Sequence, residues 1–272
     1  MAEFRKKKQY GQNFLTNVAI PKRIVAESGI TDADGVIEIG PGLGILTREL
    51  CAAAKRVVSV EIDNELAEIL PEKLSDCKNF SLVNADILQT DINALIHSEF
   101  PGMRVCVCAN LPYYITSDII MKLLEGEYGF GTITVMVQKE VAERFCSLPG
   151  TEGYGAITAS INYYAKVKRL FTVKAGSFDP RPKVDSAVIR FDPYTTPPVS
   201  FRDKKTFFAV IRAAFIQRRK TLANSLCACF PQLDKESACA VLQSCGLSPA
   251  VRGEQLGIAD YARIADHIFD IK

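Results

Sequence analysis

The sequence predicts an α/β protein in which a parallel sheet is followed by a small all-helical domain. Within residues 1–192, short runs of β-branched residues alternate with amphipathic segments, a pattern typical of a doubly wound sheet. After a proline-rich stretch, the remaining residues carry only helical patterns. The 272 residues suffice for one large domain or for two of unequal size.

Five buried strands are expected in the first part of the chain. The apolar, β-branched runs lie at 35–39, 56–62, 80–84, 105–109 and 133–138. Parallel neighbours need a crossover connection, and the amphipathic segments between the runs can provide the connecting helices. This alternation therefore predicts one parallel sheet with helices packed against it.

The stretch 192–198 is interpreted as a linker, because its three prolines are incompatible with a helix or a central strand. Beyond it, apolar residues recur at three and four spacing in four segments, which are predicted helices: 203–217, 219–229, 234–245 and 254–269. The expected division is an α/β domain at 1–192, a linker at 193–198 and a helical domain at 199–272.

The composition favours a folded protein that stays in the cytoplasm. Hydrophobic residues make up 48% and charged residues 24%, close to the averages of globular proteins. No apolar stretch reaches the roughly 18 residues that a membrane span needs, and the basic N-terminus lacks the apolar core of a secretory signal. Nine cysteines without a CxxC pair, and only two histidines, favour buried thiols over disulfides or a metal site.

Positive charge is concentrated at two places in the chain. Residues 195–272 contain 11 basic and 7 acidic side chains, whereas residues 1–194 contain 22 basic and 24 acidic ones. The densest basic segments are 1–24 and 202–220. Such patches can hold phosphates through a salt-sensitive attraction.

The first predicted strand ends in a glycine-rich loop. Gly40, Gly42 and Gly44 precede an expected helix that starts near Ile45, and glycines allow a backbone turn to approach a ligand closely. A dinucleotide fingerprint would have glycine in place of Ile45, so the loop does not favour NAD. Glu61 ends the second strand, where a carboxylate can accept hydrogen bonds from two ribose hydroxyls.

Polar residues recur at the ends of successive strands. The spacings from Gly40 to Glu61, from Glu61 to Asp86 and from Asp86 to Asn110 are 21, 25 and 24 residues, about one strand and helix each. Ligands bind at this carboxyl edge of open α/β sheets. We therefore expect a nucleoside site. The chain lacks GxxxxGK[ST], so a P-loop ATPase or kinase is not supported.

The segment Asn110-Leu111-Pro112-Tyr113 follows the fourth strand and suits methyl transfer to a planar amino nitrogen. The exocyclic amine of adenine is a poor nucleophile because its lone pair is delocalised into the ring. The Asn110 side-chain oxygen and the Leu111 carbonyl can accept its two N–H bonds and aim the lone pair at a methyl donor. Tyr113 can stack on a base that has left its helical stack.

Six motifs in order resemble those of the ribosomal RNA adenine dimethyltransferase family over nearly the full chain. They are Gln12-Asn13-Phe14-Leu15, the loop 38–44, Val60-Glu61-Ile62-Asp63, Asn84-Ala85-Asp86, Asn110–Tyr113 and Phe178-x-Pro180-x-Pro182-Lys183-Val184-Asp185-Ser186, together with the basic segment Phe215-x-Gln217-Arg218-Arg219-Lys220. The resemblance implies a Rossmann-like class I methyltransferase fold and S-adenosylmethionine as cofactor.

The resemblance also assigns roles to individual residues. The expected cofactor-binding residues are Asn13, Leu15, Gly40, Gly42, Glu61, Asp86 and Asn110. The expected catalytic and target-binding residues are Asn110, Leu111, Pro112, Tyr113 and Phe178, with Phe178 facing the target base opposite Tyr113. Arg218, Arg219 and Lys220 are expected to contact RNA, and no metal is implied.

By resemblance, the expected substrate is a pair of adjacent adenosines in a hairpin loop near the 3′ end of small-subunit (16S) rRNA. Each would become N6,N6-dimethyladenosine within a pre-assembled 30S particle, through a monomeric enzyme. Three alternatives stay open. They are an erythromycin-resistance-type dimethylase of the large subunit, a DNA adenine or protein glutamine methyltransferase, and a mainly non-catalytic ribosome assembly factor.

Overall fold

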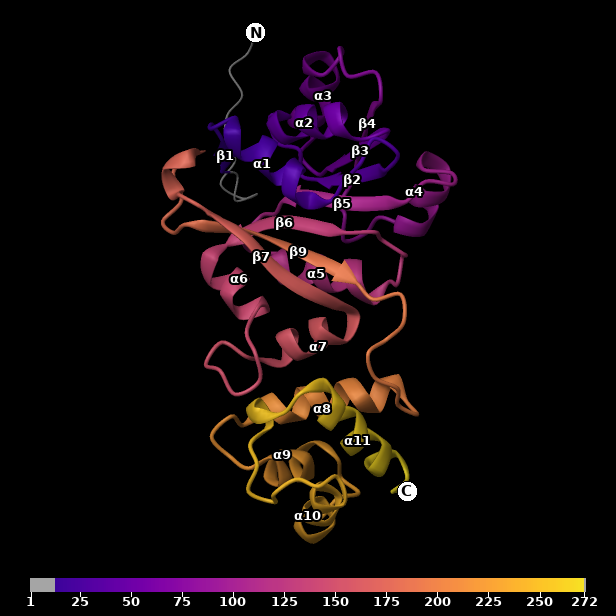
Figure 1. Cartoon of the computed structure of the whole chain (residues 1–272), viewed down its shortest axis with the longest axis vertical. Helices are drawn as coiled ribbons and strands as arrows, with labels where there is room; N and C mark the ends of the chain where they lie inside the picture. Colours follow the sequence, from indigo (N-terminus) through magenta and orange to yellow (C-terminus); the bar gives the residue numbers. More distant parts are fainter. Residues whose placement is uncertain (1–12, 272) are drawn as a thin grey trace. The chain divides into compact units, whose positions relative to one another are not determined.

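The computed structural model describes residues 13–271 (Figure 1). The predicted basic segment around Arg5–Lys8 and the motif residue Gln12 lie outside the described residues. Contacts divide the chain into two compact units. The first unit comprises the described residues up to Ala142 together with Lys166–Pro193, and the second comprises Glu143–Ala165 together with the residues from Tyr194 onward.

The first unit contains a seven-stranded sheet with the strand order β4-β3-β2-β5-β6-β9-β7. The five expected strands are present and parallel to one another: β2 (Gly35–Ile39), β3 (Arg56–Glu61), β4 (Phe80–Asn84), β5 (Val105–Asn110) and β6 (Ile133–Gln138). Their β-branched side chains form the core, and Val36, Val57 and Val107 are fully buried.

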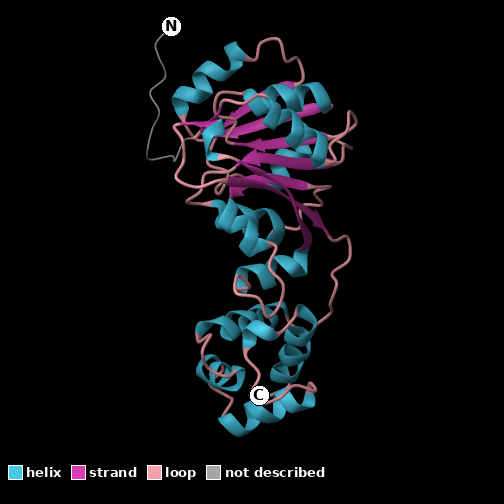
Figure 2. Ribbon diagram, turned by 60° about the vertical axis from the view of Figure 1, so that its left-hand side comes forward, coloured by secondary structure: helices cyan, strands magenta, loops and turns pink. Residues whose placement is uncertain are grey.

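Helices flank this sheet (Figure 2). The helices of the first unit follow the strands along the chain: α1 (Ala19–Ser28), α2 (Ile45–Ala53), α3 (Asn64–Lys73), α4 (Ile92–Glu99) and α5 (Thr116–Glu125), with α6 (Lys139–Phe145) extending across the unit boundary. Two of them start at aspartate caps, because the Asp63 and Asp91 carboxylates accept backbone N–H groups of the first turn. The alternation predicted from the sequence is confirmed.

Two further strands complete the sheet, and the sequence patterns did not predict them. β9 (Ser186–Pro193) lies antiparallel to β6, and β7 (Ala165–Val173) lies beyond β9 at the sheet edge. The sheet is therefore mixed rather than wholly parallel. The interpretation of 192–198 as a linker is wrong for its first two residues, which end β9. Pro193 is tolerated because it lies beyond the β6–β9 ladder, which ends at Phe191, so its missing N–H removes no hydrogen bond to β6.

A short ribbon lies beside the main sheet. β1 (Phe14–Leu15) pairs antiparallel with β8 (Phe178–Asp179), and Leu15 lies opposite Phe178. The turn η2 (Ala175–Ser177) leads into β8, and the Ser177 carbonyl accepts the Thr16 N–H at 2.9 Å. Residues separated by about 160 positions in sequence are thus tied together.

The second unit is helical, as the sequence predicts for the chain beyond 199. Its helices are α7 (Ala156–Tyr164), α8 (Lys204–Ile216), α9 (Leu222–Cys229), α10 (Lys235–Ser244) and α11 (Ile258–Phe269), with the turn η3 (Gly253–Gln255) before α11. Aromatic rings of α7 and α8 pack together, since Tyr163 and Phe207 have ring centroids 5.3 Å apart. Among residues 13–271, no helix combines the length and apolar character that crossing a bilayer requires.

Candidate nucleoside and methyl-transfer site

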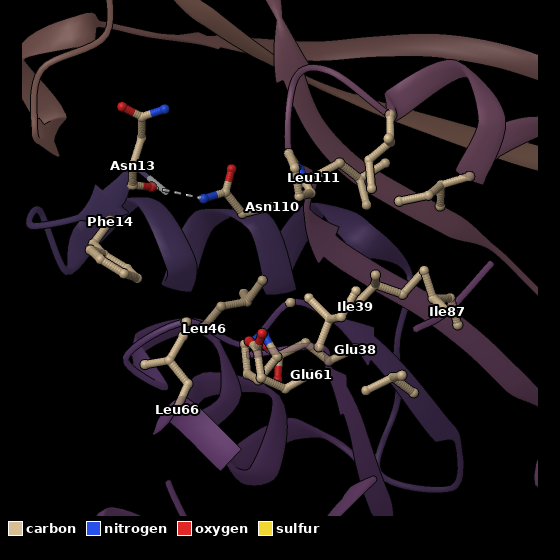
Figure 3. A pocket seen from close by; sticks show the side chains of 18 of the residues that line it. Asn13, Phe14, Glu38, Ile39, Leu46, Glu61, Leu66, Ile87, Asn110 and Leu111 are labelled. Atoms are coloured by element: carbon tan, nitrogen blue, oxygen red, sulfur yellow. Dashed lines mark hydrogen bonds between the residues drawn. The ribbon is translucent and has the colours of Figure 1, made fainter. Parts of the chain in front are cut away.

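One cavity lies at the carboxyl edge of β2, β3 and β5 (Figure 3). The cavity is open at its mouth, and the empty space among its lining residues, open solvent included, is about 1100 Å³. The lining includes every cofactor residue predicted from the sequence: Asn13, Leu15, Gly40, Gly42, Glu61, Asp86 and Asn110. The predicted loop residues Leu111, Pro112 and Tyr113 line it as well.

The glycine loop between β2 and α2 forms one wall of the cavity. Gly40, Gly42 and Gly44 all have positive φ, at 65°, 58° and 83°. A Cβ built on Gly42 would lie 3.1 Å from the Phe14 ring, and one on Gly44 would lie 3.3 Å from Leu70 and Leu74. A Cβ on Gly40 meets nothing within 4 Å. Gly40 thus lines the cavity and has open space at its Cβ position, so a ligand can approach the backbone there.

Two glutamates lie together on the floor of the cavity (Figure 3). Glu61 ends β3 and is 5% exposed, and its Oε1 accepts the Asp63 N–H at 2.8 Å. Burial raises the pKa of Glu61, while backbone N–H groups of Asp63 and Gly42 oppose that rise. The carboxylate is thus an acceptor placed at the end of a strand, as the spacing from Gly40 predicted.

Glu38 was not predicted as a site residue, although it lines the cavity and is only 1% exposed. Its Oε2 accepts the Thr47 hydroxyl at 2.7 Å and the Ser59 hydroxyl at 2.6 Å. Burial raises the pKa of Glu38 to about 7, and these two hydrogen bonds oppose the rise. The signal that could have identified it is a carboxylate within a buried apolar strand, two residues before the glycine loop.

Asp86 follows β4 and shapes a tight turn. Its Oδ1 accepts the Leu88 N–H at 2.8 Å, and its backbone carbonyl accepts the Thr90 hydroxyl at 2.8 Å. The neighbouring Ile87 is 5% exposed and lines the cavity. A carboxylate beside an apolar side chain suits a flat heterocycle that offers an N–H donor.

The loop after β5 places an amide and an aromatic ring at the cavity. The Asn110 Nδ2 donates to the backbone carbonyl of Asn13 at 3.4 Å, the contact drawn as a dashed line in Figure 3. This contact turns the Asn110 Oδ1, an acceptor, away from Asn13. The Leu111 N–H donates to Met136 O at 3.1 Å, and the Thr116 hydroxyl donates to Pro112 O at 3.0 Å. The backbone of this loop is therefore held at both ends.

Tyr113 is half-buried, and its hydroxyl lies 2.9 Å from the Ser186 hydroxyl. Burial raises its pKa, so the phenol is neutral near pH 7. The next residue, Tyr114, is 59% exposed and also lines the cavity. The loop thus presents aromatic surface where a planar base can stack.

The structure does not bring every predicted residue to this cavity. Phe178 is 4% exposed and belongs to the core cluster that includes Leu15, and it is not among the residues that line the cavity. Its expected contact with a target base stays a prediction. The physical reason for its burial is the pairing of β8 with β1, which turns the ring into the core.

The predicted RNA-binding residues lie in the second unit, in the turn after α8, and all three are exposed. Arg218 is tied within that unit, because its Nε donates to the Glu254 carboxylate and its guanidinium donates to the Glu152 carbonyl, both at 3.1 Å. Arg219 and Lys220 follow it in the turn, where the Lys220 N–H donates to Gln217 O at 2.8 Å.

The chain resembles known proteins over nearly its full length. A family model described as "Ribosomal RNA adenine dimethylase" matches residues 3–269. A relative from Clostridium botulinum, named ribosomal RNA small subunit methyltransferase A, is 42% identical over 99% of this chain and 96% of its own length. A protein of the same name from Caldanaerobacter subterraneus subsp. tengcongensis is 45% identical over 97% of each chain.

Solved structures are similar as well. A dimethyladenosine transferase from Plasmodium falciparum aligns with a TM-score of 0.79 and 26% identity, over 92% of this chain and 95% of that one. The 23S rRNA methyltransferase ErmE aligns with a TM-score of 0.71 and 28% identity, over 95% of this chain and all of that one. The name of the second of these structures specifies 23S rRNA, whereas the name of the first specifies dimethyladenosine and no particular RNA.

Proposed function

Because the chain belongs to the ribosomal RNA adenine dimethylase family, we propose that it dimethylates N6 of two adjacent adenosines in a hairpin loop near the 3′ end of small-subunit rRNA. The observation that carries the proposal is that the predicted cofactor residues and the Asn110–Tyr113 loop line the same cavity. The small-subunit target is supported by the names of relatives that are 42% and 45% identical over nearly all of this chain. A large-subunit target is not favoured, since ErmE is 28% identical.

The cofactor in this proposal is S-adenosylmethionine, and the residues of the cavity fit it. Bound there, it would supply an electrophilic sulfonium methyl. The open space at Gly40 accepts a ligand against the backbone, and Glu61 offers acceptor oxygens to two ribose hydroxyls. Asp86 and Ile87 suit the adenine, while Asn13 and Leu15 close the cavity over it.

The target adenine is held by the loop after β5. The Asn110 Oδ1 and the Leu111 carbonyl would accept the two N6–H bonds and draw the nitrogen toward tetrahedral geometry. No strong base is required, because the proton is released after the nitrogen has become cationic. Tyr113 stacks on one face of the base. Phe178 would reach the other face only if the β1–β8 ribbon shifts, since its ring is buried in the described structure.

The wider setting follows from the same resemblance. We propose that the substrate is a pre-assembled 30S particle in the cytoplasm, and that the enzyme acts as a monomer without a metal. Arg218, Arg219 and Lys220 supply positive charge for rRNA phosphates, with Arg219 and Lys220 as the principal contacts because Arg218 already pairs with Glu254.

The test is the incorporation of labelled methyl groups from S-adenosylmethionine into small subunits that lack the modification. Large subunits and naked DNA serve as parallel substrates, and nucleoside analysis identifies the product. We expect N6,N6-dimethyladenosine in small-subunit rRNA alone. Label in large subunits, or binding to small subunits without any transfer, would contradict the proposal and favour the resistance-type enzyme or the assembly factor.

Asn110→Ala provides the matched inactive variant for this test. Loss of the amide removes an acceptor for the target nitrogen, so we expect methyl transfer to be abolished while filter binding of small subunits stays largely intact. An equal loss of transfer and binding would show that Asn110 contributes to RNA affinity rather than to the chemical step.

A further inference from the structure

The loop that carries Asn110 and Tyr113 is anchored from two separate elements. At one end, Asn110 contacts the Asn13 carbonyl just before β1, at 3.4 Å. At the other end, the Tyr113 hydroxyl lies 2.9 Å from the hydroxyl of Ser186, the first residue of β9. Ser186 is fully buried and is not among the residues that line the cavity. It therefore has no direct access to a ligand there.

The position of Ser186 is fixed by its neighbours. It lies opposite Gln138 in the β6–β9 ladder, which fixes its backbone. The preceding residue, Asp185, accepts the Lys139 N–H through its backbone carbonyl at 3.0 Å. The Asp185 carboxylate accepts the Ala175 N–H and the Lys174 ammonium group, each at 3.0 Å. These contacts fix the backbone and the side chain of Asp185, directly before Ser186.

A half-buried tyrosine side chain can swing about its Cα–Cβ bond unless its hydroxyl is fixed, and stacking on a base requires the ring to stay in one place. Fixing the ring before the base arrives lowers the cost of ordering it in the complex. We propose that Ser186 is a positioning residue for methyl transfer, which holds the Tyr113 side chain in the direction that places its ring against the target adenine, and that Asp185 acts through Ser186. This inference rests on the proposed function and assigns a role to the Pro-Lys-Val-Asp-Ser segment.

The alternative is that the hydrogen bond only satisfies two polar groups and adds stability. A double-mutant cycle separates the two explanations. Ser186→Ala and Tyr113→Phe each remove the same hydrogen bond, and Tyr113→Phe keeps the aromatic ring. For both variants we expect kcat/KM on small subunits to fall about tenfold, with the Kd of S-adenosylmethionine, measured by calorimetry, unchanged within about twofold.

The double variant is expected to be no worse than either single one. Asp185→Ala is expected to lower kcat/KM in the wild-type background and to have no further effect in the Ser186→Ala background. Unchanged kinetics of the single variants, or a double variant whose loss is the product of the single losses, would overturn the inference. The inference would also be overturned if the loss of kcat/KM were accounted for by weaker cofactor binding or by a lower melting temperature.

Thr132→Val is the control for removing a buried hydroxyl from the same sheet. Within the described part of the chain the Thr132 hydroxyl has no hydrogen-bond partner, and Thr132 is 5% exposed just before β6, at the sheet end opposite the cavity. We expect its kinetics to match those of the wild type. If the wild type itself transfers no methyl group, the proposed function and this inference both fail. If the wild type transfers methyl groups but the losses of the two single variants multiply in the double variant, only the inference is rejected.

Discussion

Glu38 shows how burial can set the charge of a single side chain on the cavity wall. Its carboxyl is almost fully enclosed, and loss of water raises its pKa to about 7. The Thr47 and Ser59 hydroxyls stabilise the ionised form only in part. In the folded protein this group therefore keeps its proton up to a pH at which an unfolded chain has long lost it.

A pH-dependent stability follows from this difference. Between pH 4.5 and about 7, the folded state holds a proton that the unfolded chain releases, so stability falls as the pH rises through that window. In Glu38→Gln the side chain is always neutral and its oxygen can still accept both hydroxyls. Urea unfolding without cofactor at pH 5 and pH 8 should show the wild type losing up to about 3 kcal/mol relative to this variant. Parallel pH profiles of the two proteins would contradict this explanation.

Arg218 shows the limit of assigning a role from sequence alone. The run Gln217-Arg218-Arg219-Lys220 predicts three equivalent cations, but the fold gives Arg218 two partners within its own unit, the Glu254 carboxylate and the Glu152 carbonyl. Both partners lie far from Arg218 in sequence, so no local pattern could identify them.

At the scale of elements, the three glycines of the loop between β2 and α2 have different structural roles. Gly42 and Gly44 make room for Phe14, Leu70 and Leu74, whereas the space beside Gly40 is open. The first two are packing positions, and Gly40 is the position at which a side chain would enter ligand space. This division rests on contacts from β1 and α3, which the GxGxG spacing itself does not contain.

Gly40→Ala should therefore affect ligand binding more than folding. Its φ of +65° imposes a strain of about 1 kcal/mol on alanine, and the new methyl group occupies the open space at the loop. We expect at least a tenfold loss of S-adenosylmethionine affinity by calorimetry. Gly102→Ala is the matched control, since Gly102 has φ +70° and equally open surroundings in a surface turn. A similar loss of affinity in both variants would mean that strain, and not ligand space, is responsible.

The parallel core of the sheet could be predicted from the sequence because each of its strands is a short run rich in apolar residues, with an amphipathic segment before the next. β2, β4 and β6 have the predicted bounds, and β3 and β5 differ by one residue at one end. The residues around 165–193 were missed for physical reasons. β7 has a mixed exposed and buried pattern with many charges, as an edge strand does, and β9 inserts between β6 and β7 although it follows both in the chain.

The site was predictable where one residue at a strand end sufficed. Gly40, Glu61, Asp86 and Asn110 fall at the carboxyl edge of four strands and meet at one cavity. Contacts between distant segments were not predictable. Ser186 reaches Tyr113 only because β9 lies beside β6, and Asn13 reaches Asn110 across 97 residues.

At the scale of the whole molecule, the two units differ in fold and in how the chain builds them. The second unit combines the segment Glu143–Ala165 with the residues from Tyr194 onward, so it is assembled from two stretches of chain. Tyr154 and Phe215 pack edge to face across them, with ring centroids 5.6 Å apart. We propose that the predicted helical domain at 199–272 depends on residues 143–165 for its packing.

The salt dependence of subunit binding should follow the cations of this unit. Exposed Arg219 and Lys220 can each neutralise a phosphate, so replacing both with glutamine should weaken small-subunit binding and lower the log–log salt slope by roughly 1.5 to 2. Filter binding across a salt series measures both quantities. Arg218→Gln is the comparison, and we expect a lower melting temperature with little change in slope. A slope change as large as that of the double variant would mean that Arg218 also contacts phosphates.

The sheet order has a consequence for the newly made protein. Translation delivers β7 before β9, yet β9 occupies the position between β6 and β7, so β7 cannot join the sheet until the chain has been synthesised through Pro193. Residues 143–165 likewise can complete their packing only after the C-terminal helices have been synthesised. Ser186, whose hydroxyl contacts that of Tyr113, is the first residue of β9 and takes its place only when β9 pairs with β6. A nascent chain therefore carries an unfinished site, and competence to modify RNA begins only late in its synthesis.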